Sequence, residues 1–114
     1  MTNRRRPRER PRKALAVVWT DRALTDLEAI GDFIAADNPA AAERWVSELM
    51  ASAERAAGTP MAGRRVPECG RDDVREVLKR TYRIVYRITD GHLEILTVVE
   101  GHRQLPRDIG REGA

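Results

Sequence analysis

The stretch TYRIVYRI, residues 81–88, decides the fold. Aromatic and β-branched residues dominate it, and these residue types suit a half-buried strand. Successive side chains of a strand point to opposite faces, so the stretch divides into two sets. We expect a core face of Tyr82, Ile84, Tyr86 and Ile88, and an opposite face of Arg83, Val85 and Arg87. Residue type alone leaves two interpretations of the arginine face, a solvated surface or a functional one.

Two further strands are predicted around this stretch. Val74–Leu78 precedes it, and the short connection 79–81 predicts a hairpin. Asp90-Gly91 is a strong turn signal after it. The last strand, Leu93–Glu100, is apolar on both faces, and a strand of this kind is usually central in its sheet. Its two predicted faces are Leu93, Ile95, Thr97 and Val99 against Leu96 and Val98.

A strand and two helices are predicted earlier in the chain. The strand covers residues 15–19, and Thr20 or Asp21 is a suitable N-cap for a helix that ends near residue 37. Asn38-Pro39 then starts a second helix, which extends to about residue 57, because asparagine caps helices and proline fits the first turn. Phe33 widens the apolar stripe of the first helix, and Trp45 and Met50 belong to that of the second.

The element order is therefore β-α-α-β-β-β, which predicts an α+β fold with an antiparallel helical hairpin packed on a mainly antiparallel sheet. Residues 58–72 are read as a loop. The predicted folded domain is 14–107, followed by a weakly patterned tail, 108–114. Residues 1–13 contain seven basic groups and one acid, and we expect a disordered arm that is either solvated or able to bind phosphates.

Composition limits the possible functions. A chain of 114 residues with 41% hydrophobic content suits one folded domain. The single cysteine, Cys69, excludes an internal disulfide and favours a reducing cytoplasm. No apolar run approaches the roughly 20 residues of a membrane helix, and no signal peptide is evident. His92 and His102 lie apart from any metal-ligand spacing, so neither a metal nor another cofactor is expected.

Arginine is the residue type that remains for function. Four arginines lie in the sheet half of the chain or just after it: Arg75, Arg83, Arg87 and Arg103. The planar guanidinium suits phosphate or carboxylate, so a cluster predicts binding to RNA, DNA or an acidic protein segment. His102 is either an added titratable group beside this cluster or an ordinary surface histidine.

Several short motifs in their order resemble the RelE/ParE toxin superfamily. They are Val18-Trp19-Thr20, Asp26-Leu27, Phe33-Ile34 before Asn38-Pro39, Gly63-Arg64, Val66-Pro67-Glu68, Val74-Arg75-Glu76, Tyr82–Arg87, Ile95–Val98 and Gly101-His102-Arg103. No single motif is decisive, but the order and spacing span residues 15–106. The resemblance implies the toxin of a type II toxin–antitoxin pair, which forms a hetero-oligomer with a cognate antitoxin that folds across it.

The resemblance implies one of two activities. ParE-like members inhibit DNA gyrase, whereas RelE-like members cleave mRNA on the ribosome with basic residues and a tyrosine. Arg83 and Arg103 match the RelE-like arginines, with Arg75 as a possible substitute for missing lysines and His102 as the one acid–base candidate. No tyrosine follows Arg103. The sequence therefore favours a ParE-like gyrase inhibitor, with a RelE-like endoribonuclease and an inactive, antitoxin-binding member as alternatives.

In the preferred interpretation, the arginines at 75, 83, 87 and 103 contact the target or the antitoxin. The antitoxin is expected to bind the exposed sheet edge and the basic face, as an amphipathic helix plus an extended segment.

Overall fold

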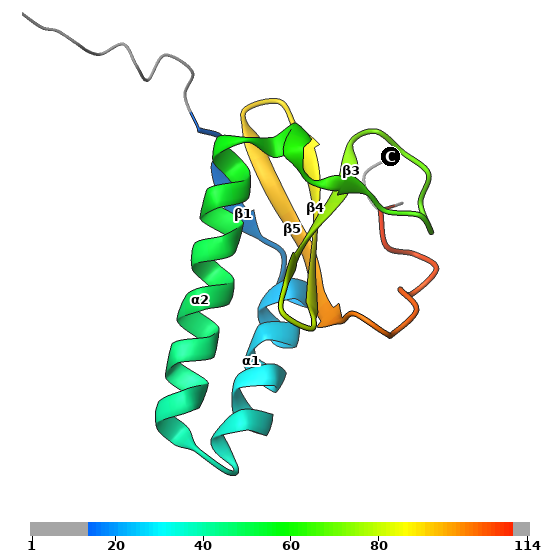
Figure 1. The fold of residues 1–114 in the computed structure, drawn as a ribbon. Helices are drawn as coiled ribbons and strands as arrows, with labels where there is room; N and C mark the ends of the chain where they lie inside the picture. Colours follow the sequence, from blue (N-terminus) through cyan, green and yellow to red (C-terminus); the bar gives the residue numbers. More distant parts are fainter. Residues whose placement is uncertain (1–13, 111–114) are drawn as a thin grey trace, which may run out of the picture.

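The computed structural model describes residues 14–110, so the predicted arm 1–13 and the end of the predicted tail lie outside the described residues. The described elements, in chain order, are β1 (Ala16–Trp19), α1 (Asp21–Ala35), α2 (Pro39–Gly58), a 3₁₀ turn (Pro60–Ala62), β2 (Arg64–Arg65), β3 (Val74–Lys79), β4 (Tyr82–Thr89) and β5 (His92–Glu100) (Figure 1). The predicted α+β fold is confirmed, with one addition. The short strand β2 lies where the sequence predicts only loop.

The five strands form one sheet in the order β1-β5-β4-β3-β2. β1 pairs in parallel with β5, and the other neighbours are antiparallel. The prediction that β5 is central is confirmed, because β1 and β4 flank it. The helical hairpin makes the parallel pairing possible, since a parallel pair needs a long crossover between its strands.

Two capping residues fix where the helices begin. Thr20 Oγ1 accepts a hydrogen bond from the Ala23 amide at 3.1 Å, and Asn38 Oδ1 accepts one from the Ala41 amide at 3.1 Å. Each side chain satisfies an amide that has no partner within its helix. The helices turn back on each other between residues 35 and 39 and pack together on one face of the sheet (Figure 1).

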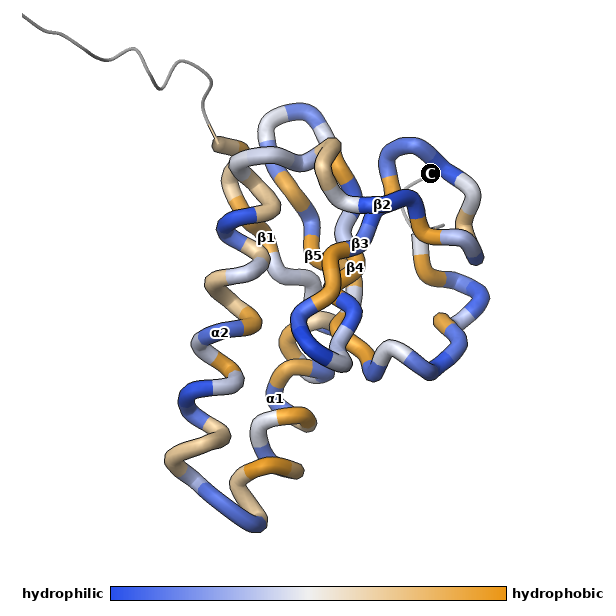
Figure 2. Tube along the Cα trace, viewed as in Figure 1, coloured by the Kyte–Doolittle hydropathy of each residue, from blue (hydrophilic) through white to orange (hydrophobic). Residues whose placement is uncertain are grey.

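The sheet is covered on both faces. The first core lies between the sheet and the hairpin and contains Leu27, Leu49, Ile84, Tyr86 and Ile95, among others. The second core lies on the opposite face, where the C-terminal segment crosses the sheet (Figures 1 and 2). It consists of Val66, Val74, Val85, Leu96, Leu105 and Ile109. The packed body therefore reaches residue 110, beyond the boundary predicted at residue 107.

A β-bulge changes the predicted faces of β5. Val85 is paired with Thr97 and Tyr86 with Ile95, so Leu96 is an extra residue in β5. An extra residue reverses the side-chain alternation beyond it. Val98 consequently packs in the first core, and Val99 packs against the second. The predicted assignment of these two valines is wrong for this reason.

The helical stripes are also narrower than predicted. Trp45 is confirmed as a core residue, packed edge-on against Tyr82 at 5.8 Å between ring centroids. Met50 is expected in the core but is 44% exposed, and Phe33, expected to widen the apolar stripe of α1, is 80% exposed, so both expectations are wrong. Successive residues of a helix are about 100° apart, which places Met50 to one side of the fully buried Leu49.

Candidate functional site

Arg83, at the centre of the predicted basic face, is buried. Its side chain is 6% exposed, and its Nε donates to Glu76 Oε1 at 2.7 Å. Its Nη2 donates to Glu68 Oε1 at 2.9 Å, and its Nη1 donates to the Arg103 carbonyl at 3.2 Å. Arg64 binds the other oxygen of Glu76. The interpretation of Arg83 as a solvated charge is wrong, because its side chain is buried and its guanidinium is bonded to these carboxylates.

These bonds form an arginine clasp, which we define as Arg83 with Glu68 and Glu76. The hydrogen bonds from Arg83 hold the pKa of Glu68 at about 2, below its usual 4.5. The same bonds raise the pKa of Arg83, so both groups are charged at neutral pH. Glu68 Oε2 also accepts from the Leu105 amide at 3.4 Å. The clasp therefore joins the 66–73 loop, the sheet and the C-terminal segment.

Arg75 and Arg87 also have partners within the chain. Arg75 donates to the carbonyls of Asp72 and Gly63, each at 2.8 Å. Arg87 Nη2 lies 2.6 Å from Glu94 Oε1 across the β4–β5 pair. Three of the four arginines predicted for recognition are thus held by bonds to their own chain.

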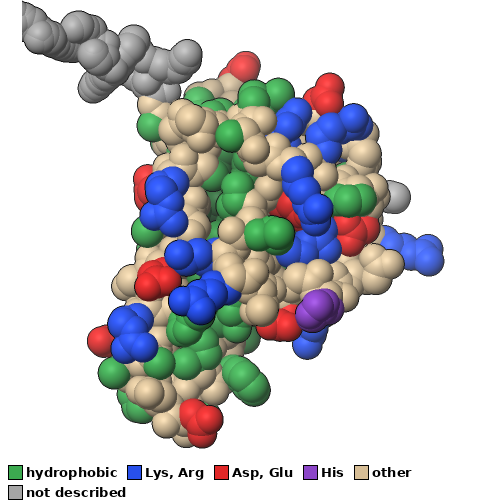
Figure 3. Space-filling view, viewed as in Figure 1, with side chains coloured by type: hydrophobic (Ala, Val, Ile, Leu, Met, Phe, Trp, Pro, Cys, Tyr) green, Lys and Arg blue, Asp and Glu red, His purple; other side chains and the backbone are tan. Residues whose placement is uncertain are grey.

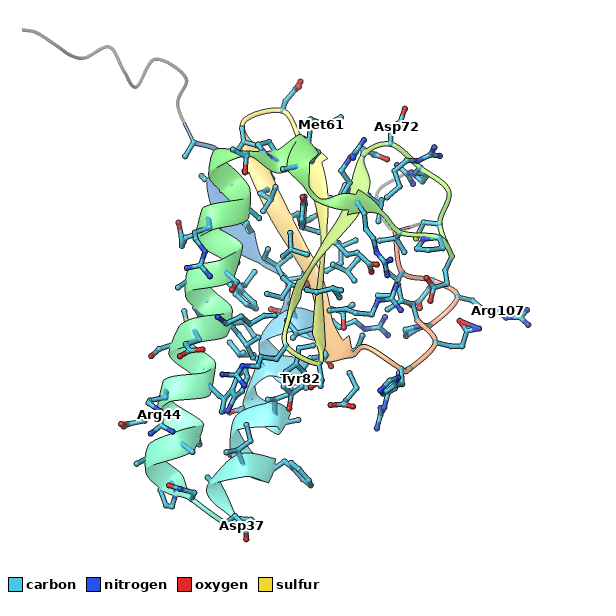
Figure 4. All side chains as sticks on the ribbon, in the orientation of Figure 1. Asp37, Arg44, Met61, Asp72, Tyr82 and Arg107 are labelled. Atoms are coloured by element: carbon cyan, nitrogen blue, oxygen red, sulfur yellow. The ribbon has the colours of Figure 1, made fainter. Side chains whose placement is uncertain are left out.

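Arg103 is different, because its side chain is exposed and makes no hydrogen bond or ion pair within residues 14–110. It lies just beyond β5 with the exposed His102. Its side chain lines a groove of about 510 Å³ between α1 and the end of β5. We call this the Phe33–Arg103 groove, and its lining residues are Asp26, Ala29, Ile30, Phe33, Tyr82, Val98, Val99, Glu100 and Arg103. Tyr82 is at the β3–β4 hairpin (Figure 4).

The sequence predicts Arg103 as a candidate binding residue but does not predict the apolar part of this groove. The sequence predicts only that Phe33 widens the apolar stripe of α1. The position of Phe33 at the margin of that stripe is the sequence signal for its exposure, since a residue at the margin of an apolar stripe can face solvent. An exposed phenylalanine beside an unpaired arginine suits a partner that brings an apolar side chain and a carboxylate.

The sheet also offers an open edge near the basic groups. β2 covers only Arg75 and Glu76 of β3, so the outer edge of residues 77–79 has no strand partner among the described residues. Leu78 is 57% exposed there. Basic side chains, interspersed with acidic ones, gather on the sheet side of the molecule (Figure 3). An edge of this kind can accept an added extended segment.

The described part of the chain lacks the features of two other classes of site. Residues 14–110 contain no group of three or more His, Cys, Asp or Glu side chains placed to hold a metal ion. They also contain no helix with the length and apolar character that crossing a membrane requires.

Comparison with known sequences gives consistent matches. The profile of the family described as ParE toxin of type II toxin-antitoxin system, parDE, matches residues 17–105. Toxin RelE2 of Caulobacter vibrioides is 38% identical over 82 residues, which cover 72% of this chain and 90% of that protein. Y4kP of Sinorhizobium fredii, which its description classes as a candidate toxin, is 39% identical over 92 residues, which cover 78% of this chain and 91% of that protein.

Two solved structures share the fold. The chromosomal ParDE system from P. aeruginosa superposes with a TM-score of 0.64 and 22% identity, covering 76% of this chain and 96% of that chain. A mutant of E. coli toxin RelE in the free state superposes with a TM-score of 0.58 and 18% identity, covering 79% of this chain and 86% of that chain. At these identities the superpositions establish the common architecture alone.

Proposed function

The chain belongs to the ParE toxin family of type II toxin–antitoxin systems, and from this we propose that it inhibits DNA gyrase and is neutralised by a cognate antitoxin. Because gyrase and the antitoxin are the proposed partners, we also propose that the protein acts in the cytoplasm. The second candidate is a ribosome-dependent mRNA endoribonuclease, which the similarity to a protein named RelE2 favours.

The state of Arg83 is the observation that supports gyrase inhibition over RNA cleavage. Metal-free cleavage of RNA needs a base, an acid and cations that contact the phosphate. Arg83 contacts two carboxylates instead, and its side chain is 6% exposed. Of the two arginines that match the RelE-like pattern, Arg103 alone is exposed, with His102 beside it. This arrangement supports a role in binding rather than in catalysis.

We further propose that Arg103 and Phe33 form the main contact for a protein partner. Apolar side chains line most of the groove, with Asp26 and Glu100 also among its lining residues. It presents an exposed aromatic side chain, Phe33, and the unpaired guanidinium of Arg103 at one rim. Arg75, Arg83 and Arg87 then act indirectly, by holding the loops and the sheet that shape the surface. An extended antitoxin segment along the open edge of β3, over Leu78, fits the same proposal.

A gyrase supercoiling assay tests the target. The purified protein should inhibit supercoiling of relaxed plasmid, and cells that express it should keep intact transcripts. Arg103→Glu should weaken inhibition or antitoxin binding by about 10-fold, because it reverses the unpaired positive charge at the rim of the proposed contact. Arg107→Glu is the matched control, since Arg107 is also exposed and points away from the body (Figure 4).

If the protein left gyrase supercoiling unchanged and cleaved mRNA on the ribosome, the second candidate, the endoribonuclease, would be the correct function. Equal effects of the two arginine substitutions would show that general charge, and not the Phe33–Arg103 groove, controls binding.

A further inference from the structure

We propose that the outer groove of the α1–α2 hairpin docks a basic amphipathic helix of another protein. This surface is separate from the Phe33–Arg103 groove and does not depend on which target the toxin inhibits. Three observations support it: the shape of the groove, its exposed apolar side chains, and the unpaired carboxylates along both rims.

Two adjoining hollows of about 440 and 520 Å³ form the groove, and they share Gly31, Asp32 and Val46. The helices approach closely here, because a Cβ atom at position 31 would lie 3.1 Å from Val46 Cγ2. Leu27 and Ala42, which are 5% and 8% exposed, lie beneath it. The groove therefore has a closed apolar floor along the hairpin.

Apolar side chains continue along the two sides of this floor. Leu24 on α1 is 48% exposed. Met50 on α2 is 44% exposed, one helical turn beyond Val46. Exposed apolar side chains gathered around a groove are typical of an interaction surface.

The rims carry acidic side chains without partners. Glu28 and Asp32 on α1 and Glu43 on α2 are exposed, and none of their carboxylates forms a hydrogen bond or ion pair within residues 14–110. Residues 20–57 contain eight acids against three arginines, a net charge of −5. A groove with this charge attracts a cationic partner and repels an acidic one.

The same charges indicate what fits the groove. A second copy docked through its own hairpin would place carboxylates against carboxylates, which is unfavourable. The basic arm 1–13 has the right charge but lacks an apolar stripe, since Met1 and two prolines are its only apolar residues. A suitable partner is a helix with apolar residues at i, i+3 or i+4 and i+7, flanked by lysine or arginine. Its apolar side chains would pack on the floor, and its cationic side chains would lie beside the carboxylates of the rims.

Both grooves can be occupied at once. Ala29 and Phe33 of α1 line the Phe33–Arg103 groove, whereas Glu28, Gly31 and Ala35 line the hairpin groove. At about 100° per residue, these two sets lie on opposite sides of α1. A partner at one groove therefore leaves the other open.

The test uses the full chain and a synthetic helix of about 16 residues that has a leucine stripe and flanking lysines. Fluorescence anisotropy should show binding that weakens at about 0.5 M salt, and NMR should show the largest amide shifts near Gly31 and Val46. The same helix with glutamate in place of lysine should not bind. Asp32→Lys should weaken binding of the lysine helix by about 10-fold.

Asp90→Lys is the matched control, because it changes the net charge equally at an exposed turn away from the groove. Equal weakening by the two substitutions would overturn the proposal in favour of general charge attraction. Absence of binding, or amide shifts centred on Arg103, would overturn it as well. None of these readouts involves gyrase or RNA, so failure here and failure of the proposed function are distinguishable.

Discussion

Replacing Arg83 with methionine tests whether this arginine stabilises the fold or recognises a partner. The substitution keeps an apolar side chain at position 83. It leaves Glu76, whose side chain is 0% exposed, with Arg64 as its remaining cationic partner within residues 14–110. Removing one partner of a buried ion pair costs about 3–5 kcal/mol. Arg64 is 61% exposed and still binds Glu76, and the 28% exposed Glu68 can be rehydrated. We therefore expect Arg83→Met to lower the free energy of unfolding by about 3 kcal/mol.

Urea unfolding at pH 7 measures this loss, and amide hydrogen exchange shows where it acts. Exchange should accelerate most at Leu105 and Ile109, because the clasp holds their segment over the second core. Glu76→Gln in the Arg83→Met background should restore part of the stability, since it removes the unpaired buried charge. Arg103→Met, whose side chain is exposed, should change the free energy of unfolding by less than about 0.5 kcal/mol.

One result would refute this reasoning. If Arg83→Met left the free energy of unfolding unchanged within about 0.5 kcal/mol while abolishing target inhibition, Arg83 would be a recognition residue and not a structural one.

Three further predictions concern local features. Asn38→Ala should lower the free energy of unfolding by about 1 kcal/mol in urea titrations, because the α2 amide at Ala41 loses its cap. Gly63→Ala should cost about 1–3 kcal/mol, since a Cβ there would collide with the Tyr86 hydroxyl; adding Tyr86→Phe should recover part of the loss. Glu68, with its pKa lowered from 4.5 to about 2, contributes stability above pH 4.5 that is lost as the pH falls toward 2. Acid titration of Glu68→Gln should lack that component, and an unchanged acid profile would contradict the assignment.

The order of the elements was predictable because its signals are local. The alternation of residues 81–88 and the Asn38-Pro39 start depend on neighbouring residues, whose preferences hold before any tertiary contact forms. The central position of β5 followed from its two apolar faces. The predicted pairs of strands and the helical hairpin are confirmed for these reasons.

The sequence by itself determined the α+β order, the capped helices and the core face of β4. The tertiary structure decided what covers the other face, which is a weakly patterned C-terminal segment carrying Leu105 and Ile109. It also paired Arg83 with Glu68, a loop residue 15 positions earlier. Periodicity shows which side chains share a face, but whether that face meets water, carboxylates or apolar side chains depends on contacts between distant segments. For that reason the sequence located the arginines, and only the fold separated the buried Arg83 from the exposed Arg103.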